Sequence, residues 1–388
     1  MAYDEKTVKE RLSDFELPSE DSNAPVELIK DAIEGGMKYQ QKILDNIKQI
    51  QLLITAESKN WLSSPNLDTP TYQIVGGVDG SFFPIPSLAG YWYTPFSIAM
   101  ISFESLQDAT HIGLNVKSES DFFHPPPKAT QVVEGFSSYF ESIPMLIRRR
   151  AAQLMLYGET RAIELITDKL PANSMIFIDG PVVDPPAGAP LDLISKRVEA
   201  IKTAWEKNII IVGIVKRIHD SYLSKRLFEE RWAITNWYSF NMGDRVLMSP
   251  LFDQYREEFD GFDHKLFTPW MDTSTETQDA VLYNLRGLKR ISGLYQSARN
   301  TGLTRIEVFV RSSVNDDFIN TIWDKVKIAT GKWTYPGHSW PVPVIAAHEN
   351  CKISKEMAIT LHQEFISKLV GGDQHAFSSI YSLMLNEV

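Results

Sequence analysis

The chain has 388 residues and a net charge of −10, with 43% apolar and 23% charged residues. This is the balance of a globular protein with a substantial core, and no apolar run reaches the length of a membrane span. The first six residues lack the pattern of a signal peptide, and the single cysteine, Cys351, excludes an internal disulfide and a multi-cysteine zinc site. We therefore expect a soluble, cytoplasmic protein without membrane association. Its net negative charge argues against a protein that binds nucleic acid through the overall charge of its surface. A local basic channel can nevertheless coexist with an acidic exterior.

Residues 1–62 are predicted to be a polar tail followed by an amphipathic helix from about Pro25 to Trp61, in which apolar residues recur at three- and four-residue steps. A domain is predicted from 63 to 388. Its early elements alternate in type, in the order strands at 72–82, 89–103 and 110–118, helix 137–170, strand 175–180, helix 191–207 and strand 209–216. This order predicts an α/β fold with a mixed sheet and flanking helices.

The second half of the domain is predicted to hold an insertion and the end of the core. Residues 218–302 are rich in aromatic side chains and are predicted to be a mainly helical insertion. A strand at 304–311, a helix at 316–330 and a terminal helix from about Ile345 follow. The core is therefore expected at about 70–217 and 303–360.

Two predicted strands end in an Asp-Gly pair, at Asp79 and at Asp179. A single Asp-Gly pair is commonly a turn. Two such pairs on neighbouring strands would bring two carboxylates together, and these repel unless a cation neutralises them. Gly76, Gly77 and Gly80 surround Asp79 with backbone only, which would let a nucleic-acid backbone approach closely.

Glu159 is the predicted third carboxylate because it falls in the middle of the apolar face of helix 137–170. A buried carboxylate needs a partner or a metal. The alternative is a salt bridge to one of the nearby arginines, which are Arg148, Arg149, Arg150 and Arg161. The order strand carboxylate, helix carboxylate, strand carboxylate is how a ribonuclease H-like sheet binds one or two divalent ions, with Mg²⁺ or Mn²⁺ favoured by oxygen ligands.

Short motifs in a fixed order resemble the NurA nuclease family over about residues 70 to 355. They are Gly77-Val78-Asp79-Gly80-Ser81, Phe177-Ile178-Asp179-Gly180, Val212-Gly213-Ile214-Val215-Lys216, Arg305-Ile306-Glu307 and the segment from Pro341 to Glu349. The resemblance implies a ribonuclease H-like fold and Mn²⁺-dependent cleavage of DNA, by single-strand endonuclease and 5′–3′ exonuclease activity. It also implies a homodimer that acts with a HerA-type hexameric helicase in DNA end resection and recombinational repair.

Carried over residue by residue, the resemblance makes Asp79, Glu159 and Asp179 metal-binding carboxylates and His348 the histidine that completes the site. A lone histidine is more often structural, but near the start of a helix it could ligate metal or shuttle a proton. The family usually has a tyrosine eight residues before this histidine, where this chain has Trp340. An indole there could stack on a base.

Lys216 follows a predicted strand, where its ammonium could meet a phosphate or could simply be an ordinary strand-end lysine. Two groups of basic residues are either solvated faces or phosphate contacts. They are Arg217, Lys225, Arg226 and Arg231, and Arg286, Lys289 and Arg290.

Other functions fit parts of this pattern. Asp79 and Asp179 could be the carboxylate pair of a glycoside hydrolase. A non-catalytic module that docks on a DNA translocase could keep the same fold. A nucleotide-driven motor is disfavoured because the sequence has no phosphate-binding loop of the Gly-x-x-x-x-Gly-Lys-Ser/Thr type.

Overall fold

The computed structural model describes 61–86 apart from Thr71 and Gln73, then 92–103, 115–123, 143–183, 191–227, 243–259, 264–274 and 287–369, with Gly371, His375 and parts of 33–48. The chain divides into two units, Met1–Thr55 and Ala56–Val388. In the first unit the described residues are helical, from Ile33 to Lys48, within the predicted helix. The rest of that helix lies outside the described residues.

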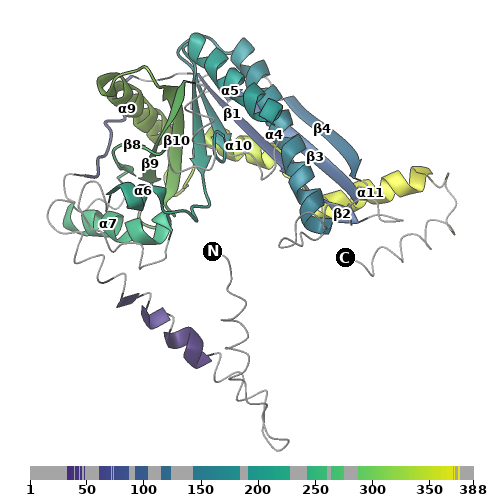
Figure 1. Cartoon of the computed structure of the whole chain (residues 1–388), viewed down its shortest axis with the longest axis horizontal. Helices are drawn as coiled ribbons and strands as arrows, with labels where there is room; N and C mark the ends of the chain where they lie inside the picture. Colours follow the sequence, from purple (N-terminus) through teal and green to yellow (C-terminus); the bar gives the residue numbers. More distant parts are fainter. Residues whose placement is uncertain are drawn as a thin grey trace, which may run out of the picture. The chain divides into compact units, whose positions relative to one another are not determined.

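The second unit is built on a mixed sheet (Figure 1). In chain order its strands are β1 (Val75–Phe82), β2 (Ile85–Pro86), β3 (Trp92–Phe103), β4 (Asn115–Phe123), β5 (Met175–Asp179), β6 (Ile210–Val215), β7 (Leu266–Phe267), β8 (Met271–Asp272), β9 (Leu288–Gln296) and β10 (Thr304–Arg311). In space the order is β2-β3-β1-β5-β6-β10-β9-β7, with β4 beside β3 and β8 beside β9. The pairs β1–β5 and β5–β6 are parallel, and the other pairs are antiparallel.

Helices cover both faces of this sheet. They are α4 (Ile143–Lys169), α5 (Leu191–Glu206), α6 (Tyr222–Lys225), α7 (Asp244–Phe259), α9 (Asp316–Lys332), α10 (Val342–Cys351) and α11 (Lys355–Leu369). Helix α4 packs on β1, β3 and α5, whereas α10 packs on β1, β3 and β5. A side chain at Gly76 would meet Ile166 of α4, and one at Gly77 would meet Pro343 of α10. Because neighbouring strand residues point to opposite faces, α4 and α10 lie on opposite faces of the sheet.

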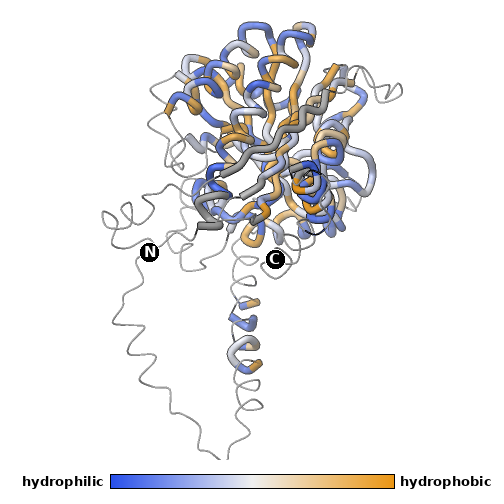
Figure 2. Tube along the Cα trace, turned by 90° about the vertical axis from the view of Figure 1, so that its right-hand side faces the viewer, coloured by the Kyte–Doolittle hydropathy of each residue, from blue (hydrophilic) through white to orange (hydrophobic). Residues whose placement is uncertain are grey.

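Strands β5 and β6 carry no polar residue before Asp179 at the end of β5, because both of their faces are covered. Every residue of β6 is buried, as are the first four of β5. Two apolar cores result. One joins the sheet to α9 and α10, and the other joins it to α4 and α5. Figure 2 shows the apolar segments running through the interior of this unit and the hydrophilic residues mainly at its periphery.

The first half of the domain confirms the predicted order of elements. The path β1-β3-β4-α4-β5-α5-β6, with β1 between β3 and β5, is the expected ribonuclease H-like arrangement. Among the described residues, no helix is long and apolar enough to cross a bilayer.

The second half differs from the prediction in its insertion, where β7, β8 and β9 join the main sheet, and in its terminal helix. Residues 288–296, expected within the insertion, form β9, a strand of the main sheet that pairs with β10 along its length. The expected single terminal helix is two helices, because the chain leaves helical geometry at Lys352 and the Ile353 amide donates to Ser81 Oγ at 3.0 Å.

One residue of the second predicted basic group, Arg290, is not at the surface. Arg290 is buried, and its guanidinium contacts Glu307 at 3.5 Å and the Tyr222 ring at 5.2 Å. The positive charge of Arg290 therefore neutralises the buried Glu307 carboxylate. Arg231 and Arg286, from the two predicted groups, lie outside the described residues.

Candidate metal centre

Asp79 and Asp179 lie on adjacent parallel strands at the same level of the sheet. The register of β1 and β5 pairs Val78 with Ile178, and the next residue on each strand is the aspartate. The prediction that two strand aspartates meet is therefore confirmed. β1 ends at Phe82, the end of the predicted range, so Asp79 lies within the strand, paired with Ala99 of β3, and not at its end as the Asp-Gly pair suggested.

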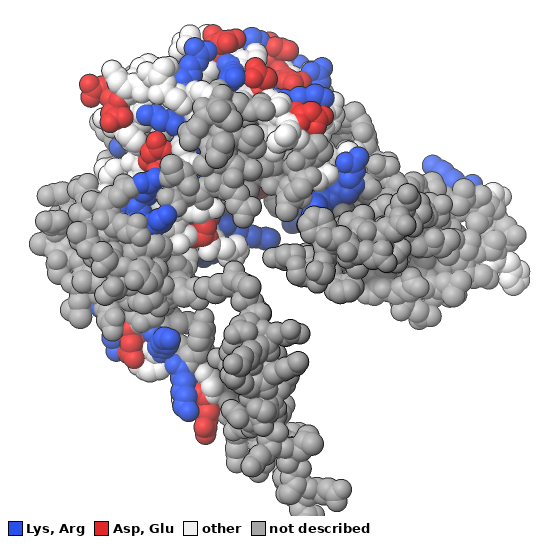
Figure 3. Space-filling view, viewed as in Figure 1, with Lys and Arg blue, Asp and Glu red and all other residues white. Residues whose placement is uncertain are grey.

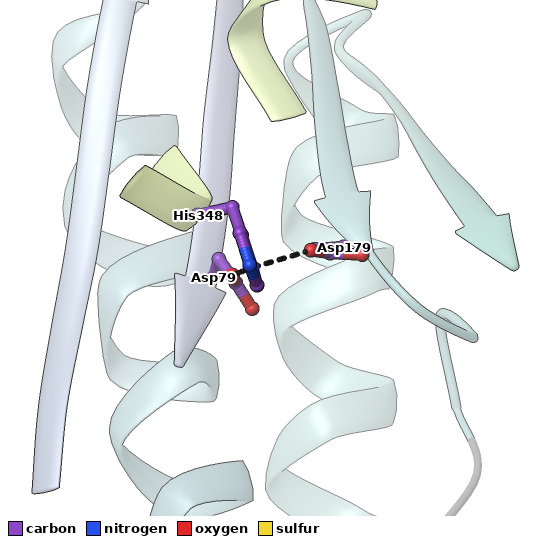
Figure 4. Close-up of side chains that lie close together, drawn as sticks. All are labelled: Asp79, Asp179 and His348. Atoms are coloured by element: carbon purple, nitrogen blue, oxygen red, sulfur yellow. Dashed lines mark hydrogen bonds and ion pairs between the residues drawn. The ribbon is translucent and has the colours of Figure 1, made fainter. Parts of the chain in front are cut away.

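Helix α10 brings His348 to both carboxylates (Figure 4). Its Nδ1 atom lies 2.8 Å from Asp79 Oδ2 and 3.1 Å from Asp179 Oδ2. This approach depends on Gly77, since a Cβ there would lie 2.1 Å from the Pro343 carbonyl oxygen in the first turn of α10. The glycine thus sets the close packing that carries the histidine to the strands.

Lys216 follows the last residue of β6 and reaches the same edge of the sheet. Its Nζ atom donates to Asp179 Oδ2 at 2.6 Å. It also lies 4.0 Å from the centre of the Trp340 ring, in cation–π contact. Trp340 therefore contacts a basic residue of the site, and the sequence reading of this position as a base-stacking residue did not anticipate that contact.

Glu159 is buried, as predicted, on the inner face of α4. Its ion-pair partner is not one of the four arginines considered from the sequence. Arg197 of α5, itself fully buried, places Nη2 3.5 Å from Glu159 Oε2. Arg161 instead pairs with the neighbouring Glu164 on the outside of α4. Arg197 falls among the apolar residues of the predicted helix 191–207. A buried arginine needs an acidic partner, so this position was the sequence feature that could have predicted the pair.

The surroundings of Asp79 and Glu159 favour the protonated forms of these two carboxyls when no metal is bound. Burial raises the pKa of Asp79 to about 8, and repulsion from Asp179 adds to the rise. Burial likewise raises the pKa of Glu159 to about 7, with Arg197 opposing the shift. Burial and the charge of Asp79 also raise the pKa of the Cys351 thiol well above its usual range. A cation at this site would relieve the clustering of negative charge.

The donor set fits a divalent ion. One ligand atom from each of Asp79, Asp179 and His348 lies within 4.8 Å of the others. Carboxylate oxygens with one imidazole suit Mn²⁺ or Mg²⁺. Glu159 is outside this group of three, although the charges of Asp79 and Asp179 both raise its pKa.

Charged residues of both signs are interspersed over the face seen in Figure 3. No single sign dominates the described part of that face. This distribution agrees with the modest excess of acidic over basic residues, 49 against 39. The described part of this face therefore resembles a mixed protein surface more than a broad basic one.

The sequence model of the NurA domain matches residues 74–353, which include all of the residues above. The chain belongs to the NurA domain family. No curated protein sequence matches this NurA-domain chain. Among solved structures, it resembles the NurA nuclease from Sulfolobus solfataricus, with a TM-score of 0.53 and 14% identity over 89% of this chain and 97% of that one. A weaker match is endonuclease V of Ciona intestinalis bound to DNA, with a TM-score of 0.33 and 11% identity over 83% of this chain and 98% of that one. Another is the catalytic domain of human endonuclease V, with a TM-score of 0.30 and 13% identity over 85% and 98% of the two chains.

Proposed function

We propose that this chain is a metal-dependent deoxyribonuclease whose ion is held by Asp79, Asp179, His348 and Glu159. The observation that carries the proposal is the meeting of two strand aspartates and a helix histidine at one edge of a ribonuclease H-like sheet. Family membership supports it, since the similar Sulfolobus solfataricus protein is a nuclease. A bound Mn²⁺ or Mg²⁺ would activate water and stabilise the leaving oxygen of a phosphodiester.

The protein's own residues have distinct roles in this proposal. Asp79 is buried and rigidly oriented, since its Oδ1 accepts from the Gly80 amide at 2.7 Å. His348 Nδ1 is close enough to exchange a proton with either aspartate. Lys216, held between Asp179 and the Trp340 ring, is placed to contact a phosphate oxygen and to stabilise negative charge that develops there.

The finer activity is proposed from the family. We infer single-strand endonuclease and 5′–3′ exonuclease cleavage of DNA in end resection and recombinational repair, as a homodimer working with a HerA-type hexameric helicase. The chain has no phosphate-binding loop of its own, so movement along DNA would need energy from such a partner.

The test is digestion of end-labelled single- and double-stranded DNA with Mn²⁺, with Mg²⁺ and with EDTA. We expect metal-dependent cleavage by the wild type and its loss in Asp79→Asn. The matched control is Asp324→Asn, because Asp324 is an exposed aspartate paired with Lys327 far along the chain from the site. Activity that resists EDTA would refute the metal-dependent mechanism.

The partnership has its own test. Sedimentation of the chain alone should give twice the mass of 44.1 kDa. Addition of a HerA-type ATPase should yield a larger complex and ATP-dependent resection of linear duplex DNA. If the chain by itself cleaves no DNA but its complex with the ATPase does, the enzyme depends on docking. If neither the chain nor the complex cleaves DNA, the proposed activity is refuted.

A further inference from the structure

Glu159 approaches the site from the face opposite to His348. A side chain at Gly77 would meet α10, whereas one at Gly80 would lie 2.5 Å from Met155 and 3.0 Å from Glu159 Oε1, both on α4. Asp79 points to the α10 side, as Gly77 does, because strand residues alternate between faces. Asp79 and Glu159 therefore come to β1 from opposite faces of the sheet.

The pairing of β1 with β5 ends just before the two aspartates, on the stretch of β1 that Glu159 approaches. The β1–β5 ladder ends at Val78 and Ile178, so Gly80 lies beyond the last paired residue on that side. After Asp179 the chain leaves the parallel register at Gly180, which has a φ of +119° and bridges Ile214 of β6 rather than β1. Gly80 has no side chain to fill the space, so Glu159 Oε1 lies close against the strand beside Asp79.

Arg197 holds the other oxygen of Glu159. Its Nε donates to the Val182 carbonyl at 2.8 Å and its Nη1 to Thr160 Oγ1 at 3.4 Å, which fixes the plane of the guanidinium. Its Nη2 is buried, has no hydrogen-bond partner among the described residues and lies 3.5 Å from Glu159 Oε2. A fully buried guanidinium aimed at a buried carboxylate restricts where that carboxylate can move.

We propose that Arg197 is a positioning residue that anchors Glu159 Oε2 on the α4–α5 side, so that Oε1 is presented to the metal past the bare backbone of Gly80. The inference rests on the proposed metal site and adds a residue of α5 that no ligand set includes. Residues that orient metal ligands typically change metal affinity or activity about 10- to 100-fold when replaced.

A double-mutant cycle tests this role, using wild type, Arg197→Lys, Glu159→Gln and the double variant. Lysine keeps the buried positive charge but lacks the fork that makes three contacts at once. Mn²⁺ affinity is measured without DNA, by titration calorimetry and by the electron paramagnetic resonance signal of free Mn²⁺. Lys202→Arg is the control, because Lys202 also lies on α5 but pairs with Glu199 at the surface.

We expect Arg197→Lys to weaken Mn²⁺ binding about 10- to 100-fold in the wild-type background and to have no further effect in Glu159→Gln. The same loss in both backgrounds would show a general structural effect and overturn the inference. So would unchanged affinity in Arg197→Lys. If Asp79→Asn abolishes Mn²⁺ binding while Glu159→Gln leaves it intact, the positioning role fails but the metal site stands. Wild-type protein that binds no Mn²⁺ would refute the metal site and the positioning role together.

Discussion

The buried Asp79 carboxyl leads to a prediction in which loss of a proposed metal ligand stabilises the metal-free protein. Its pKa is about 8 in the folded chain against a usual value of 3.8, and the side chain is only 4% exposed. A carboxyl group whose pKa is higher in the folded than in the unfolded chain stabilises the folded state fully below pH 3.8. This stabilisation is lost as the pH rises through 8. The metal-free wild type should therefore become less stable between pH 4 and pH 8.

The magnitude follows from the two pKa values. At 1.36 kcal/mol per unit, the raised pKa of Asp79 lowers the free energy of unfolding by about 2 kcal/mol at pH 5 and about 5 kcal/mol at pH 8, because the carboxyl ionises more readily in the unfolded chain. Asparagine has nearly the same shape and no charge to bury. In EDTA, Asp79→Asn should therefore exceed the wild type in free energy of unfolding, by an amount that grows by about 3 kcal/mol from pH 5 to pH 8.

The assay is urea unfolding followed by tryptophan fluorescence, in EDTA, at several pH values from 5 to 8. Asp324→Asn should differ from the wild type by less than about 1 kcal/mol throughout, since exposed pairs contribute little. Adding Mn²⁺ at about 100 times its dissociation constant should stabilise the wild type by about 2.7 kcal/mol and leave Asp79→Asn unchanged. A difference between Asp79→Asn and the wild type that does not change with pH would refute the reasoning.

Three further predictions follow from other contacts. Gly77→Ala should lower stability by more than about 3 kcal/mol and abolish Mn²⁺ binding, measured by urea unfolding and calorimetry, because its Cβ would lie 2.1 Å from the Pro343 carbonyl oxygen. Trp340→Leu should reduce kcat about 10-fold at saturating Mn²⁺ by releasing Lys216, while Trp340→Phe keeps an aromatic face and most of the rate; equal rates in both variants would contradict this role. Arg148 is exposed and lies three turns, or about 16 Å, before Glu159 on the same side of α4, where it could contact a DNA phosphate. Arg148→Ala should therefore reduce the slope of log DNA affinity against log salt concentration by about 1, and an unchanged slope would exclude this phosphate contact.

The aspartates could be predicted from the sequence because their signal is local. Each is preceded by apolar residues and followed by glycine, and the strand order then brings them together. Strand β9 could not be predicted in the same way. Its polar residues Lys289, Arg290 and Ser292 disguise the strand period, and Arg290 is compensated by Glu307 on the neighbouring strand. Burial of such residues depends on a tertiary partner that periodicity does not reveal.

The partner of Glu159 was missed for a related reason. A helical wheel compares a residue with its own helix, and it gave four arginines close in sequence as candidates. The residue that pairs with Glu159 is 38 positions later, on the next helix across the same face of the sheet. The wheel correctly predicted that the carboxylate is buried, but the choice of partner depends on how α4 and α5 pack together.

The glycines around Asp79 have a different role in the structure from the one predicted from the sequence. The sequence suggested that they open space for a nucleic-acid backbone, but two helices occupy that space. Gly76 and Gly80 face α4, and Gly77 faces α10, with a Cβ at each too close to its neighbour. A strand with glycines on both faces allows helices to approach within contact of its backbone from both sides. The same property brings His348 from one face and Glu159 from the other to a single edge of the sheet, so the glycine pattern and the site are consequences of one packing requirement.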